Sequence, residues 1–232
     1  MNTYAEHIAA AQASPEARAA FIRRTYAHLA GAILTFVGLE AYMIHSPIAL
    51  MLLQVMSMRF GWLLILGGFI LLGQLARGLA AGGASQTTQY VGLTLYVIAE
   101  SIIFAPILLI ATYYAPDVLP TAAILTLLLF GALSLVVFTT RKDFSFLRGI
   151  LVVGSMLALG LIVCAVLFGF NLGLVFSFAM VLLASGAILF DTSRILLHYR
   201  TDQHVAAALQ LFASIALLFW YVLQIVMSLS RR

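Results

Sequence analysis

Seven long apolar stretches dominate this sequence and limit its fold more narrowly than any other feature. Hydrophobic residues make up 64% of the 232 positions and charged residues only 9%, whereas a soluble domain carries about 25% charged residues. We therefore predict an all-α integral membrane protein, with residues 1–24 as an N-terminal segment and residues 25–232 as a single transmembrane domain. The seven expected spans are residues 25–46, 62–81, 90–113, 120–139, 148–168, 172–196 and 205–228.

The N-terminal segment carries the signals of a helix start. Ser14 fits an N-cap, Pro15 the first helical position and Glu16 the first turn, so we expect a short amphipathic helix on the membrane surface. The pair Arg23–Arg24 leads into a full-length span without a cleavage site, which argues against a cleaved signal peptide. The run "IALMLLQVMSM" is too short to cross a bilayer and is expected at the interface or as an extension of the second span.

Basic residues predict the orientation, because Lys and Arg accumulate in cytoplasmic loops. With the N-terminus in the cytoplasm, most basic residues lie inside: Arg18, Arg23, Arg24, Arg77, Arg141, Lys142, Arg148, Arg194 and Arg200. The outer side then holds Arg59, Arg231 and Arg232. We therefore expect a cytoplasmic N-terminus and an external C-terminus.

Several functional classes are disfavoured. The isoelectric point of about 9.5 does not indicate nucleic-acid binding, because the basic residues are scattered at helix ends and form no stripe. Cys164 is the single cysteine, which excludes an internal disulfide, and no Cys/His cluster suggests a metal or redox site. We find no nucleophile–base pair, so we expect neither an enzyme nor a bound cofactor.

Ionisable residues inside spans are costly and are candidates for function. Glu100 lies deep in the third span, and Pro106 leaves the Ile102 carbonyl without its helical donor one turn away. Such a carboxylate suits either a cation or proton site or a structural hydrogen bond to a neighbouring helix. Three residues near span ends are expected to be interfacial: Glu40, His28 and His45.

Asp191 begins a second candidate site. One helical face of the sixth span is small, then acidic, then basic, and consists of Ala184, Ala187, Asp191, Arg194 and His198. The pattern allows either a structural Asp191–Arg194 pair at the helix end or a functional carboxylate.

The seventh span carries a polar stripe at alternating steps of four and three residues: Gln210, Ser214, Leu217, Tyr221, Gln224 and Ser228. Lipid would penalise such a stripe, so it must face protein or water, and we predict that this helix is central. The stripe fits either interhelical hydrogen bonding or an ion pathway through Gln210, Tyr221 and Gln224.

Distances from the turns predict which polar residues meet. Asp191 and Ser214 lie at similar distances from the turn at Thr201–His204, so we expect them to face one another at one level. Arg77 is at a comparable depth. The expected result is a latch of Asp191 with Arg77, Arg194, Ser214 and Gln210.

Three motifs in this order, "AESIIFAPI", "TTRKDFSFLRG" and "LFDTSRIL", resemble the Bax inhibitor-1 family in its bacterial, YccA-like branch, over roughly residues 20–230. The resemblance implies six helices around a central seventh, and a pH-gated calcium leak. It also implies a gate of two aspartates with an arginine partner. Asp191 matches the first aspartate and Arg77 the arginine, but Ser214 stands where the second aspartate is expected, so no proton can be shared between two carboxylates there.

Three functions remain open at this point. The first is an ion-leak protein, with calcium as the conducted ion, Asp191 as gate and Glu100 as a deeper cation site. The second, which the resemblance also implies, is a non-catalytic regulator of a membrane-bound AAA protease in the bacterial inner membrane, with residues 1–21 as a mobile handle. The third is proton-coupled transport, although no inverted repeat supports it.

Overall fold

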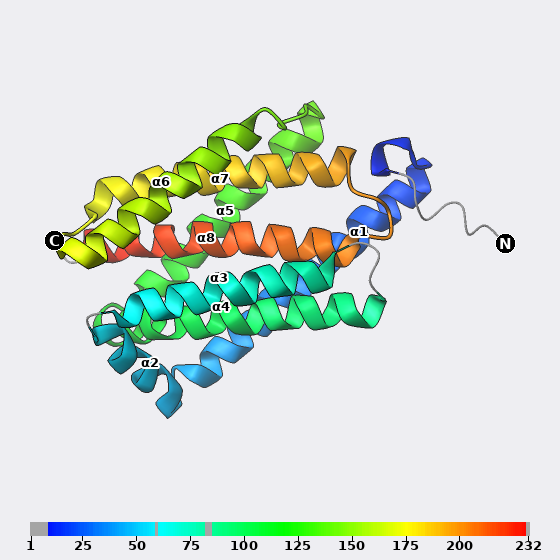
Figure 1. Ribbon diagram of the computed structural model, residues 1–232. Coiled ribbons are helices and arrows are strands. Elements are labelled where there is room, and N and C mark those ends of the chain that lie inside the picture. The colour runs from blue at the N-terminus through cyan, green and yellow to red at the C-terminus, as the bar shows by residue number, and fades with distance from the viewer. Residues whose placement is uncertain (1–8, 59, 82–84, 231–232) are drawn as a thin grey trace.

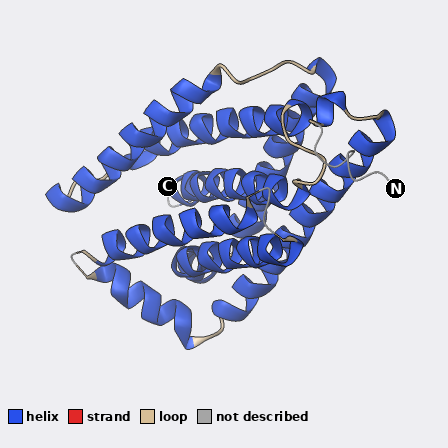
Figure 2. Cartoon of the chain, turned by 45° about the vertical axis from the view of Figure 1, so that its right-hand side comes forward, coloured by secondary structure: helices blue, strands red, loops and turns tan. Residues whose placement is uncertain are grey.

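The computed structural model describes residues 9–58, 60–81 and 85–230. The expectations that rest on Arg59, Arg231 and Arg232 lie outside these residues, as do those for residues 1–8 and 82–84. The described chain is helical, without strands (Figure 2). Its elements are η2 (Ala10–Gln12), α1 (Pro15–Met43), α2 (Pro47–Ser57), α3 (Gly61–Ala80), α4 (Gln86–Tyr114), α5 (Val118–Thr140), α6 (Leu147–Phe168), α7 (Gly173–Leu197) and α8 (His204–Ser230).

Helix α1 starts as predicted but does not stop where expected. The Ser14 side chain accepts a hydrogen bond from the Ala17 N–H at 3.3 Å, and Pro15 is the first helical residue. The helix then continues unbroken to Met43, so the expected short surface helix is wrong: it is the first part of a longer helix. Its sequence has no glycine or proline near residue 24 that would end it.

The "HSP" join turns the chain sharply. Ser46 caps α2 by accepting from the Ile48 N–H at 3.3 Å, and Pro47 opens that helix. The axes of α1 and α2 differ by 85°, so the short apolar run forms a helix of its own. By length and composition, the six helices α3 to α8 can cross a membrane, and the bent pair α1–α2 makes a seventh if it is one span.

Helix α8 lies at the centre of the bundle (Figures 1 and 2). It packs against α1, α3, α4, α5 and α7, whereas α6 packs mainly against α7 and touches α3. The described N- and C-terminal parts lie at opposite ends of the bundle (Figure 1). We call these the N-terminal end, which holds the α7–α8 turn, and the C-terminal end, where α8 finishes.

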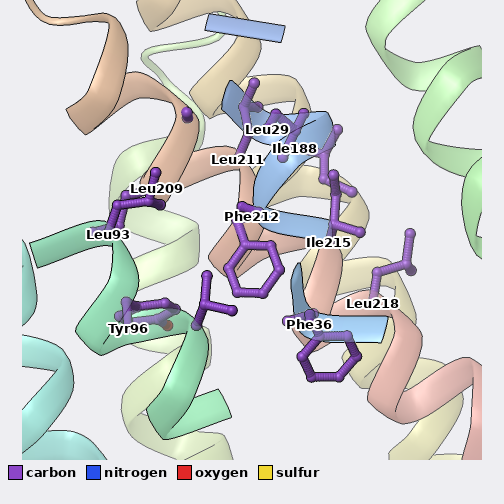
Figure 3. Close-up of a cluster of buried hydrophobic side chains, with 14 of the residues drawn as sticks. Leu29, Phe36, Leu93, Tyr96, Ile188, Leu209, Leu211, Phe212, Ile215 and Leu218 are labelled. Atoms are coloured by element: carbon purple, nitrogen blue, oxygen red, sulfur yellow. The ribbon is translucent and has the colours of Figure 1, made fainter. Parts of the chain in front are cut away.

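The interior is built mainly from α1, α4 and α8. Phe36 of α1, Tyr96 of α4 and Phe212 of α8 converge in one aromatic group (Figure 3). The ring centroids of Phe36 and Tyr96 lie 5.9 Å and 6.2 Å from that of Phe212, in edge-to-face contacts. Helix α6, in contrast, buries only Ala158. The core therefore fixes α8 firmly against α1 and α4 and leaves α6 at the edge.

Candidate functional site

Asp191 is held by two side chains of the central helix. Its carboxylate, in a residue only 2% exposed, accepts a hydrogen bond from the Ser214 hydroxyl at 2.6 Å. The Gln210 amide nitrogen donates to both carboxylate oxygens at 3.3 Å. The prediction that Asp191 and Ser214 face one another at one level is confirmed, and these bonds join α7 directly to α8.

Arg194 does not form an ion pair with Asp191. Its guanidinium carbon lies 5.4 Å from the ring centre of Phe190 and 5.5 Å from that of Tyr199. Within the described chain, the ion pairs closer than 4.0 Å are His198–Asp143 and Arg200–Asp202. Arg194 therefore acts on Asp191 through its charge rather than by contact.

Arg77 turns towards α4 instead of α7. Its guanidinium carbon lies 5.6 Å from the centre of the Tyr96 ring, and Tyr96 stands four residues before Glu100 on α4. Glu100 is 5% exposed. The structure thus places Arg77 against Tyr96, one helical turn from Glu100, while the Asp191 carboxylate bonds to Ser214 and Gln210. Sequence reasoning missed Tyr96, although its spacing of four residues from Glu100 places both on one helical face.

A small cavity of about 300 Å³ opens at the N-terminal end above Asp191. Arg77, Arg194 and His198 line it, and so does Gln210, which bonds to Asp191. Within the part of the chain that the structure describes, no aspartate or glutamate lines this space. The cavity is therefore cationic, and Gln210 connects it to the buried carboxylate.

A larger cavity of about 720 Å³ lies at the C-terminal end, lined by α6, α7 and α8 and by one residue each of α3 and α4. Tyr221, Gln224 and Ser228 of the predicted stripe line it, and the Ser177 hydroxyl donates to the Gln224 side-chain oxygen at 3.5 Å. Leu217, the apolar member of the stripe, packs with Tyr221 and the buried residues Ala158 and Met180. The polar stripe is thus interrupted by apolar packing between its two halves.

Two sequence motifs meet at the N-terminal end. The Phe144 N–H of the α5–α6 loop donates to the Ser193 hydroxyl of α7 at 3.2 Å, and Asp143 lies 3.5 Å from His198. The hydroxyl and N–H of Ser145 donate to Asp143 and hold its carboxyl pKa below the ordinary value. The segments "RKDFSFL" and "LFDTSRI" therefore form one contact, which their separation in sequence did not reveal.

Three further expectations have different outcomes. Glu40 is not interfacial: it is 5% exposed, and neither carboxylate oxygen has a hydrogen-bond partner in the described chain. His45 is exposed, as an interfacial side chain would be. His28 is half-buried and bonds to the Tyr90 hydroxyl at 2.8 Å. Among the described residues, no group of three or more His, Cys, Asp or Glu side chains could hold a metal ion.

The described part of the N-terminal segment is docked on the bundle. The Ala10 N–H donates to the Tyr199 carbonyl at 2.7 Å, and the Arg18 guanidinium donates to the Ala10 carbonyl at 2.8 Å. Residues from Ala9 onward are therefore tied to the α7–α8 turn, so the expectation of a mobile handle over residues 1–21 is wrong for this part.

These features define a class: an all-α integral membrane protein whose last helix is central and is joined to its neighbour by a buried carboxylate. The sequence profile of the family described as inhibitor of apoptosis-promoting Bax1 matches residues 18–231. The chain therefore belongs to the Bax inhibitor-1 family, as the three motifs had indicated.

Individual relatives place the chain in the bacterial branch. An uncharacterized protein of Pseudomonas aeruginosa is 38% identical over 110 residues, which are 47% of this chain and 49% of that protein. The protein named modulator of FtsH protease YccA, from Escherichia coli K12, is 38% identical over 116 residues, 50% of this chain and 52% of that protein. The chain thus spans about half the length of these two relatives. Bax inhibitor 1 of Schizosaccharomyces pombe is 28% identical over 223 residues, 93% of this chain and 79% of that protein.

Proposed function

We propose that this protein is a gated ion-leak channel in its closed conformation, with Asp191 as the gate and calcium as the conducted ion. The observation that carries this proposal is the buried Asp191 carboxylate, bonded to Ser214 and Gln210 of the central helix. A buried polar group of this kind is costly unless it is satisfied. Gln210 connects it to the cavity at the N-terminal end, where the positive charges of Arg77 and Arg194 would oppose the entry of a cation while the latch is closed.

Opening would require α7 and α8 to separate at this latch. The Ser214 hydroxyl and the Gln210 amide would lose their acceptor, while the apolar packing around Leu217 would have to part before the two cavities could join. Glu100 would then be the carboxylate available to a cation deeper in the bundle, one helical turn from the Tyr96 ring that Arg77 contacts. In the expected orientation the latch faces the cytoplasm.

Calcium-dye-loaded liposomes provide the test. The purified protein should leak little, and Asp191→Asn should leak more, because an amide is a weaker acceptor for both donors. Asp117→Asn is the matched control, since Asp117 is an exposed carboxylate in the α4–α5 join at the C-terminal end. Absence of calcium flux in both proteins from about pH 5 to about pH 8 would overturn the channel proposal.

A second candidate is favoured by one observation, the name of the Escherichia coli relative, modulator of FtsH protease. On this alternative the chain is a non-catalytic regulator of a membrane-bound AAA protease in the bacterial inner membrane. Co-purification of such a protease with the intact chain, together with slower degradation of a membrane substrate in its presence, would support it. Normal degradation rates at saturating amounts of the chain would exclude it.

A further inference from the structure

The C-terminal-end cavity has the size and lining of a ligand site. Its volume of about 720 Å³ lies within the range of roughly 300–1,000 Å³ that small-molecule sites occupy. Aromatic rings form much of its wall: Trp62 and Trp220 stack with ring centres 5.9 Å apart, and Phe176 meets Tyr221 edge-on at 5.8 Å. A compact apolar body would therefore find a large contact area.

Among the described residues, no charged side chain lines this cavity. A charged ligand in such a site would lose its hydration without gaining a counter-ion, which is strongly unfavourable. The cavity also differs in this respect from the one at the N-terminal end, where Arg77 and Arg194 are exposed to the space. The electrostatics therefore select an uncharged ligand.

Polar groups with unused hydrogen-bonding capacity reach into the same space. Tyr221 is 6% exposed, and its hydroxyl has no hydrogen-bond partner among the described residues. Gln224 uses its side-chain oxygen to accept from Ser177, while its amide nitrogen has no partner in the described chain. An ester carbonyl or hydroxyl on a ligand would satisfy both donors, which a purely apolar occupant could not do.

Helix α6 places this cavity beside the bilayer. One helix separates it from lipid on that side, since α6 buries only Ala158 and packs mainly on α7. The cavity extends to Ser228 in the last turn of α8, where a spanning helix reaches the headgroup region. A lipid-like amphiphile could therefore enter the cavity from the bilayer beside α6, with its polar group directed into the cavity.

We propose that the C-terminal-end cavity is a binding site for an uncharged amphiphile drawn from the bilayer, a glyceride-like molecule with an apolar chain and a hydrogen-bonding ester or hydroxyl group. Tyr221 and Gln224 bind the polar group, and the aromatic wall around Trp62 and Trp220 contacts the chain. This site is separate from the Asp191 latch. Its occupancy can be measured without ion flux, although the proposed opening would join this cavity to the one at the N-terminal end.

The two tryptophans allow a direct test, because they are the only tryptophans in the chain and both line the cavity. The full-length protein is placed in phosphatidylcholine nanodiscs and titrated with a brominated monoacylglycerol, whose bromine atoms quench tryptophan emission on contact. We expect saturable quenching at a low mole fraction of this probe. Brominated fatty acid, as the anionic analogue, and brominated phosphatidylcholine, as bulk lipid, should quench only in proportion to their amounts.

Variants separate site binding from general lipid contact. Ala165→Phe fills the cavity and should abolish the saturable component, whereas Tyr221→Phe and Gln224→Leu should each weaken binding roughly tenfold through one lost hydrogen bond. Tyr114→Phe is the matched control, because Tyr114 is 81% exposed at the end of α4; its binding curve should equal that of the unaltered protein. Circular dichroism checks that each variant is folded.

Three results would overturn the proposal. They are non-saturable quenching by the monoacylglycerol, tighter binding of the anionic analogue, and a binding curve that Tyr221→Phe and Gln224→Leu leave unchanged. The experiment measures tryptophan emission and not calcium flux. Its outcome therefore tests lipid binding even if the protein proves not to be a channel.

Discussion

The two halves of α8 carry the same kind of polar stripe but meet different partners. In the N-terminal half, Ser214 and Gln210 are engaged by Asp191, beside a cationic cavity of about 300 Å³. In the C-terminal half, Tyr221 and Gln224 line a cavity of about 720 Å³ to which the described residues contribute no charged side chain. The difference comes from α7, which offers a carboxylate to one half and Ser177 with aromatic side chains to the other. A polar stripe on a central helix therefore becomes a latch only where a neighbouring helix supplies a charged acceptor.

Replacing Ser214 by aspartate should have the largest effect, because it turns the latch into a repulsive pair. Ser214→Asp would place two carboxylates face to face, and one proton shared between them in acid would be lost as the pH rises. We expect lower thermal stability and higher calcium leak at neutral pH than in acid, with a stability difference of about 2–4 kcal/mol. Thermal unfolding and dye flux across the pH range measure both.

The isosteric control for that variant is Ser214→Asn, which adds similar volume without a second charge. It should be destabilising to the same extent at every pH. A pH profile of Ser214→Asp that parallels the profile of Ser214→Asn would show that no coupled pair forms and that the two halves differ less than the contacts indicate.

Asp191→Asn should have the next largest effect. The two donors from α8 would lose a charged acceptor, and hydrogen bonds to charged groups contribute about 1.5–3 kcal/mol. We expect a corresponding drop in unfolding free energy in detergent, while Asp117→Asn stays near the unaltered protein. Equal unfolding temperatures for both variants would show that the bonds from Ser214 and Gln210 to Asp191 do not stabilise the protein. The two halves of α8 would then not differ in stability as proposed.

Arg77 sharpens the comparison by a double-mutant cycle. Because Arg77 contacts Tyr96, one helical turn from Glu100, and makes no ion pair with the Asp191 carboxylate, Arg77→Gln and Glu100→Gln should show a coupling energy of about 1 kcal/mol. The cycle of Arg77→Gln with Asp191→Asn should be additive within roughly 0.5 kcal/mol. Coupling of Arg77 with Asp191 but not with Glu100 would show that Arg77 is the partner of Asp191, as the family resemblance implies.

Asp143 should give the smallest effect. The Ser145 donors lower its pKa, so the charged form contributes stability at neutral pH, and that contribution is lost as the pH falls through the lowered pKa. Asp143→Asn should therefore slightly lower the unfolding temperature at neutral pH and leave it unchanged in strong acid. Because the side chain is 46% exposed, added salt should reduce the part that comes from His198. A difference that grows in acid would contradict this sign.

Sequence reasoning recovered the features that periodicity and turn distance control. The lengths of the apolar runs gave the membrane class, the Ser14–Pro15 pair gave the start of α1, and the common turn predicted the contact between Asp191 and Ser214. These features depend on residues close in sequence or on two helices joined by one short turn.

The missed features depend on packing between distant helices. The apolar surface of α6 suits lipid and protein equally, so the sequence could not show that this helix lies at the edge or that a cavity lies behind it. Arg77 has a long side chain, and the rotation of α3 about its axis decides whether that side chain reaches Tyr96 or α7. Glu40 is near a helix end in sequence, yet the 85° turn after α1 leaves it enclosed.

The central position of α8 has a consequence for how the protein is made. The helix against which α1, α3, α4, α5 and α7 pack is synthesised after all of them. Until it is inserted, the earlier helices cannot complete their buried faces, and Asp191 has no donor from α8. Assembly therefore needs a late, long-range step that brings α8 to α1, and the nascent chain depends on protection in the membrane until α8 is inserted.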